Sequence, residues 1–125
     1  MIERVAIRIA ALAGLLAVAL GAFGAHGLKD ILEHNQTTAI WEKAVLYHFI
    51  HALMLFFLAT RPAALGFAKG AWICFVVGIF IFSGSLYLLA VTNVRWLGAI
   101  TPIGGISFIA GWAWLLVCGG GKSSK

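Results

Sequence analysis

The chain of 125 residues is 62% apolar and only 10% charged, and it carries a net charge of +5. Because a typical soluble domain is roughly 45–50% apolar and about 25% charged, this composition excludes a water-soluble globule, and the many aromatic and branched residues exclude a disordered chain. The Lys and Arg residues lie in ones and twos at the ends of apolar runs, which argues against a nucleic-acid partner and favours the lipid bilayer as the environment.

The first apolar run covers residues 9–25. As a helix it is roughly 26 Å long, the short end of what crosses a bilayer, and including residues 5–7 lengthens it. Four small residues recur along it at spacing four: Ala13, Ala17, Gly21 and Ala25. Such a stripe lets another helix approach closely. We therefore expect it to serve helix packing, either within the bundle or between protomers.

A polar stretch follows over residues 26–43, and the second apolar run covers residues 44–60. In the polar stretch, Leu28, Ile31 and Leu32 fall on one side of a short helix, a pattern typical of a helix that lies in the membrane interface. The second membrane helix is expected to begin near Thr38. It should end at Arg61, because a residue before proline is pushed away from helical geometry.

The third and fourth apolar runs cover residues 71–92 and 96–118. Pro102 lies inside the fourth run and is expected to kink that helix. Backbone polar groups in lipid must all be satisfied, and unbroken apolar runs of this length fit helices rather than barrel strands. The predicted fold is an all-α integral membrane domain over residues 1–118, an antiparallel bundle of four transmembrane helices. Residues 119–125 form a flexible tail that cannot pack a core.

The distribution of Lys and Arg sets the expected orientation. Six lie at the N-terminus, in the second loop and in the tail, and three lie in the first and third loops; they are Arg4, Arg8, Arg61, Lys69, Lys122 and Lys125 against Lys29, Lys43 and Arg95. Cytoplasmic loops of membrane proteins carry the excess of positive charge. Both termini, and with them the tail, are therefore predicted to lie in the cytoplasm.

Polar residues inside the apolar runs mark the candidate site, because ionisable groups are costly in lipid and usually face the bundle interior. The second helix carries a His/Tyr face, His26 ends the first helix at the same membrane level, and the last two helices add hydroxyl groups. The full set is His26, Tyr47, His48, His51, Ser83, Ser85, Tyr87 and Thr101. We expect these side chains to converge in the outer leaflet, with Glu42 above them.

Three interpretations fit this polar cluster. Neutral His and Tyr side chains can hydrogen-bond across helices and fix the bundle, and this structural interpretation is preferred. Histidines can also hold a metal or haem, although no acidic residue lies on the apolar part of the second helix. A quinone, lipid or proton-relay site is the third. The sequence requires no cofactor and leaves metal binding open.

Four segments carry a family resemblance. Residues 21–28 are GAFGAHGL, residues 41–52 follow W-x-x-A-x-x-Y-H-x-x-H-A, residues 82–87 are FSGSLY, and residues 97–105 are LGAITPIGG with Gly-Trp at 111–112. In this order the segments resemble the small inner-membrane family called domain of unknown function 423 (the YgdD type). The resemblance covers nearly the whole chain. It implies four membrane helices and a multi-pass location in the bacterial inner (plasma) membrane.

The resemblance implies no established activity. It places these residues within the family's characteristic motifs: His26, His51, Ser83, Ser85, Tyr87, Thr101 and Pro102. The sequence also lacks a nucleophile elbow, a phosphate-binding loop and an HExxH motif. The leading hypothesis is a non-enzymatic accessory, assembly or scaffold subunit that forms a homo-oligomer or joins a larger membrane complex. The alternative is a ligand-binding membrane protein that uses the cluster. A permeation unit is least favoured, since the inner half of every predicted helix is apolar.

Overall fold

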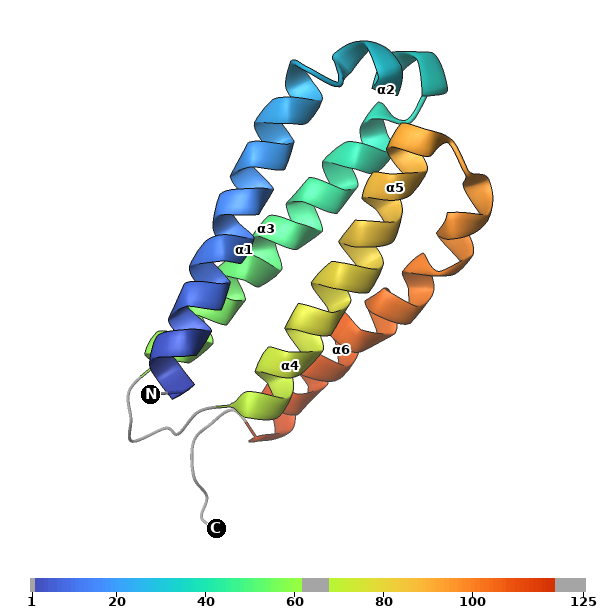
Figure 1. The fold of residues 1–125 in the computed structure, drawn as a ribbon. Coiled ribbons are helices and arrows are strands. Elements are labelled where there is room, and N and C mark those ends of the chain that lie inside the picture. The colour runs from blue at the N-terminus through green and yellow to red at the C-terminus, as the bar shows by residue number, and fades with distance from the viewer. Residues whose placement is uncertain (1, 62–67, 119–125) are drawn as a thin grey trace.

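The computed structural model of the chain describes residues 2–61 and 68–118, so Pro62 and the predicted tail over 119–125 lie outside it. Within these ranges the structure contains helices and no strand (Figure 1). The elements are α1 (Ile2–Ala25), α2 (Lys29–Asn35), α3 (Thr38–Thr60), α4 (Lys69–Gly78), the π-helical η2 (Ile79–Ser83), α5 (Gly84–Thr92), the 3-10 helix η3 (Arg95–Ala99) and α6 (Thr101–Cys118).

Four spans of this structure are long and apolar enough to cross a membrane: α1, α3, the continuous segment Lys69–Thr92 and the segment Arg95–Cys118. Successive spans run antiparallel, so the start of α1 and the end of α6 lie at the same end of the bundle, and α2 lies at the other end (Figure 1). The predicted all-α, four-helix membrane fold is confirmed. The first helix begins earlier than the apolar run suggests, at Ile2.

The spans pack in the order α1, α3, α4–η2–α5 and α6, with α1 against α3 and α6 against α4 and η2. The α1 span and the Arg95–Cys118 span are accordingly the least buried of the four. The largest apolar core cluster lies where the spans meet, and Leu55, Leu58, Phe75 and Phe108 are among its buried members. The histidine face of α3 points into this region, which positions the site described below.

Small residues of α1 form the contact with α3, but not along the predicted spacing. Ala17 is fully buried, and a Cβ atom on Gly21 would lie 3.3 Å from Val45 Cγ1. Ala25 is exposed, and Gly24 takes its place in the interface. A methyl group on Gly24 would overlap the indole of Trp41. Within this chain the stripe serves packing inside the bundle, with Gly24 replacing Ala25.

The predicted short helix between the first two spans is present as α2, and its apolar side packs on the bundle. Leu32 is buried against Trp41 and Ala90. The Thr37 hydroxyl donates to the carbonyl of Ala90 across 2.7 Å, and Asn35 Nδ2 donates to the same carbonyl across 3.0 Å. The last carbonyl groups of a helix have no partner within that helix. The α2–α3 corner therefore caps the end of α5.

The third span contains a π-helical turn that the sequence pattern did not predict. At η2 the backbone of Phe82 approaches α6 so closely that a Cβ atom on Gly104 would overlap it. The wider turn also places Ser83, which is fully buried, against α3. Its hydroxyl donates to the carbonyl of Ala44 across 2.7 Å. Single π turns of this kind are rare insertions within α-helices.

The expected kink at Pro102 is wrong. The chain forms the 3-10 helix η3 over Arg95–Ala99, and α6 then begins at Thr101. Pro102 therefore lies in the first turn of α6, where its missing N–H would have no intrahelical partner. The proline starts a helix instead of bending one.

Candidate functional site

His51 joins α3 to α6 at the centre of the candidate site. Its Nε2 lies 3.0 Å from the indole Nε1 of Trp112, and its Nδ1 lies 2.7 Å from the carbonyl oxygen of Tyr47. An indole N–H can only donate and a carbonyl can only accept. His51 is therefore neutral, with its proton on Nδ1, and both ring nitrogens are occupied.

Aromatic side chains pack around the His51 ring, and one of them stacks on its face. The Phe108 ring stacks on it with centroids 3.7 Å apart and an interplanar angle of 10°, and Phe75 lies at 5.1 Å. Only 4% of His51 is exposed. A ligand or metal at this ring would have to displace the stacked rings or break one of the two hydrogen bonds.

His48 joins α3 to α5. Its Nδ1 lies 2.8 Å from the hydroxyl oxygen of Tyr87. The Tyr87 hydroxyl can donate to Nδ1 or accept from it, depending on which ring nitrogen of His48 carries the proton. Each histidine of α3 is thus held by a side chain from another span of the bundle.

Hydroxyl groups complete the links between the last two spans. Ser85 Oγ lies 2.6 Å from Thr101 Oγ1, and it is also 3.0 Å from the carbonyl of Phe82. Further down the bundle, Ser107 donates to the carbonyl of Cys74 across 2.7 Å. Together with Ser83, these residues use their hydroxyls to connect one span to the next.

The predicted convergence fails for His26, Tyr47 and Glu42. His26 is exposed at the end of α1, where it lines a depression on the surface of that helix. Tyr47 is 38% exposed, and its ring packs on Phe82 with centroids 4.8 Å apart. In the bonds described above, Tyr47 contributes its backbone carbonyl. Glu42 lines a separate groove. Among the described residues no three His, Cys, Asp or Glu side chains are grouped to hold a metal ion.

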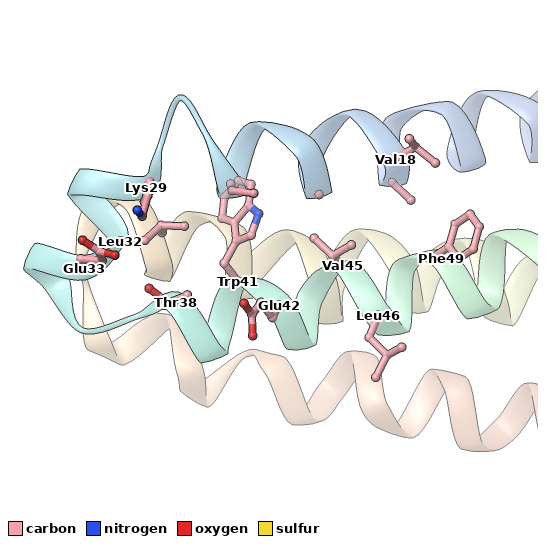
Figure 2. Close-up of a pocket in the computed structure, with 14 residues that line it drawn as sticks. Val18, Lys29, Leu32, Glu33, Thr38, Trp41, Glu42, Val45, Leu46 and Phe49 are labelled. Carbon is pink, nitrogen blue, oxygen red and sulfur yellow. The ribbon is translucent and has the colours of Figure 1, made fainter.

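A groove between α1, α2 and α3, which sequence reasoning missed, is a second candidate site. It has a volume of about 600 Å³. Figure 2 shows Lys29 and Glu33 of α2 at one end of the groove and Val18 and Phe49 at the other. The α1 wall is low because its lining residues are mostly small: Ala17, Gly21, Gly24 and Ala25. The small-residue stripe of α1 was the signal in the sequence that could have indicated this groove. Its spacing alone does not show which part of the stripe is left uncovered by the neighbouring helices.

Comparison with known proteins assigns the chain to a family. The sequence profile described as "Protein of unknown function (DUF423)" matches residues 20–105, which is more than half of the chain and includes every candidate residue from His26 to Thr101. The chain belongs to the DUF423 family. The resemblance stated from its four segments is confirmed.

Relatives of this DUF423 protein are named as membrane proteins. It is 47% identical over 118 residues to the UPF0382 membrane protein YwdK of Bacillus subtilis, covering 91% of this chain and 94% of the relative. It is 47% identical over 116 residues to a UPF0382 membrane protein of Staphylococcus epidermidis, covering 91% and 93%. No solved structure matches the chain. With four apolar spans, this DUF423 protein is a multi-pass membrane protein.

Proposed function

We propose that this DUF423 protein is a non-catalytic membrane protein that acts through its lateral helix surfaces, as an accessory, assembly or scaffold subunit of a homo-oligomer or larger membrane complex. One observation carries the proposal: the polar groups of the intramembrane cluster are used to join helices. His51 bonds to Trp112, His48 to Tyr87, and Ser85 to Thr101.

Catalysis would require a different arrangement of these groups. A general acid or base needs a nitrogen or oxygen within hydrogen-bond reach of a substrate. His48 and His51 are each 4% exposed; both ring nitrogens of His51 are hydrogen-bonded, and Nδ1 of His48 is paired with Tyr87. The same occupancy weighs against haem, metal or quinone binding by the cluster, because the ligand would have to replace existing bonds.

The lateral surfaces of α1 and α6 offer the contact area that a subunit needs. On α1, Leu15 is 63% exposed and Val18 is 61% exposed. Beside them, nothing lies within 4 Å of the position that a Cβ atom on Gly14 would take. On α6, Ile106 and Ile109 are 66% and 68% exposed. Helices associate in lipid by close van der Waals packing, which small residues beside large apolar ones permit.

The proposal includes an orientation with both termini in the cytoplasm of the bacterial inner membrane. The end of the bundle that holds the start of α1 and the end of α6 carries Arg4, Arg8, Arg61 and Lys69 (Figure 1). The opposite end carries Lys29, Lys43 and Arg95. The counts favour the first end as the cytoplasmic one, by the same rule that applies to loops of other membrane proteins.

Photo-crosslinking in native membranes tests the subunit role. The photoreactive residue p-benzoylphenylalanine replaces Leu15 on α1 or Ile109 on α6, and samples kept in the dark are the control. We expect a light-dependent adduct of defined mass at one of these positions at least, and a detergent-solubilised complex heavier than the monomer. A monomer that forms no adduct at either position would contradict the proposal.

A further inference from the structure

We propose that the groove between α1, α2 and α3 binds one glycerophospholipid whose headgroup carries a phosphate and a primary ammonium group. The site is separate from the helix-joining cluster. The inference does not rest on the proposed subunit role.

The groove is polar at one end and apolar along the rest of its length. Lys29, Glu33 and Glu42 lie toward its α2 end, and its walls further along are formed by Val18, Val45 and Phe49 (Figure 2). From Thr38 to Phe49 the α3 wall is roughly 16 Å long at about 1.5 Å per residue. Its volume of about 600 Å³ is within the range of about 300–1,000 Å³ that is usual for small-molecule sites. This polarity matches an amphiphile that lies along the helices.

The inner wall of the groove is fixed by Trp41. Only 4% of Trp41 is exposed, and its indole N–H donates to the carbonyl of Leu20 across 2.9 Å. The indole packs where Gly24 has no side chain, so it is held between α1 and α3. A wall held in this way is formed before a ligand arrives, which lowers the entropy cost of binding.

The position of the charges fits a lipid in its membrane orientation. The α2 end lies where α1 and α3 leave their apolar spans, and lipid headgroups lie at that level of a bilayer. The apolar part of the groove runs from there along the helices, as an acyl chain does. Lys29 has a long apolar stem that can follow the groove while its ammonium group stays among the headgroups.

The signs of the charges select the headgroup. Within the part of the chain that the structure describes, Lys29, Glu33 and Glu42 form no ion pair with another residue. Lys29 can pair with a phosphate, and the two carboxylates can accept hydrogen bonds from an ammonium group. A primary ammonium group offers three N–H donors, whereas a choline headgroup offers none. A headgroup with net negative charge meets two carboxylates and one ammonium group, which disfavours it.

The binding test uses the full chain in detergent with defined lipids. Native mass spectrometry and thermal unfolding are measured with dioleoyl phosphatidylethanolamine, phosphatidylcholine and phosphatidylglycerol. We expect one retained phosphatidylethanolamine molecule and the largest rise in unfolding temperature with that lipid. The double variant Glu33→Gln with Glu42→Gln should bind it about tenfold more weakly. Lys29→Gln should also weaken binding.

Neighbouring charges provide matched controls. Asp30→Asn and Lys43→Gln remove the same kinds of charge beside the groove, but these residues do not line it, so binding should not change. Leu46→Trp should fill the groove and remove the adduct while the unfolding temperature without lipid is retained. Equal binding of the three lipids, a preference for phosphatidylglycerol, or a second copy of the chain seated in the groove would each overturn the proposal.

Discussion

Trp112 of α6 donates its indole N–H to Nε2 of His51 on α3 across 3.0 Å. This bond fixes the tautomer of His51 and places its remaining N–H on the carbonyl of Tyr47. The polar groups of His51 and Trp112 would be costly in lipid if they were unpaired. Paired with each other, they form a contact between α3 and α6. The same principle applies to His48 with Tyr87 and to Ser85 with Thr101.

A double-mutant cycle on His51 and Trp112 measures that contact. The variants His51→Phe, Trp112→Phe and the double variant are compared by equilibrium unfolding in mixed detergent micelles. We expect a coupling energy of about 0.6 kcal/mol, and at most about 1.7 kcal/mol, as for other hydrogen bonds between membrane helices. Combining His51→Phe with Trp114→Phe is the control and should give additive effects. Additivity of the His51 and Trp112 substitutions would contradict the assignment.

Alanine substitutions at Gly104 and at Gly105 test whether α6 packs closely against η2. Gly104→Ala places a methyl group into the backbone of Phe82, whereas a Cβ atom on Gly105 would lie 3.8 Å or more from the Phe82 ring. We expect Gly104→Ala to cost about 1–3 kcal/mol of unfolding free energy. Gly105→Ala should stay within about 0.5 kcal/mol of the parent. Equal effects in thermal unfolding would show that η2 and α6 are not in close contact.

Gly24→Ala should disturb the contact between α1 and α3. The added methyl group overlaps the Trp41 indole, which must move and lose its bond to Leu20. We expect a lower unfolding temperature and a changed environment of Trp41 in its fluorescence. Gly14→Ala is the matched control, because nothing lies within 4 Å of its Cβ position. A Gly24→Ala variant that behaves as Gly14→Ala does would argue against this packing.

Cysteine labelling decides the orientation. In a background with Cys74→Ser and Cys118→Ser, a single cysteine replaces Glu3 at the start of α1 or Asp30 on α2. These residues lie at opposite ends of the bundle. Charge distribution predicts that a membrane-impermeant maleimide labels Asp30→Cys in intact protoplasts and labels Glu3→Cys only after lysis. The reverse pattern would place the termini outside the cell.

The small-residue stripe of α1 shows what residue spacing in a sequence can predict about helix packing and what it cannot. Residues four apart rotate by about 40° relative to each other around an α-helix, so a stripe from Ala13 to Ala25 turns away from a straight neighbour. Residues seven apart drift by only about 20°, and Ala10, Ala17 and Gly24 form a buried series at this spacing, preceded by the buried Ala6. The sequence indicated which helix would use small residues, and the crossing of α1 with α3 decided which of them do.

The membrane environment, the four spans and the short helix between the first two can all be predicted from the amino-acid sequence. These features follow from local apolar content, because lipid admits long apolar segments only as helices with satisfied backbone groups. The folded bundle was needed to see that His51 meets Trp112, that His26 stays outside the cluster, and that a groove remains beside Trp41. Such pairings depend on how far each helix is rotated and shifted against its neighbours. No spacing within a single helix encodes those quantities, since packing of all four spans sets them together.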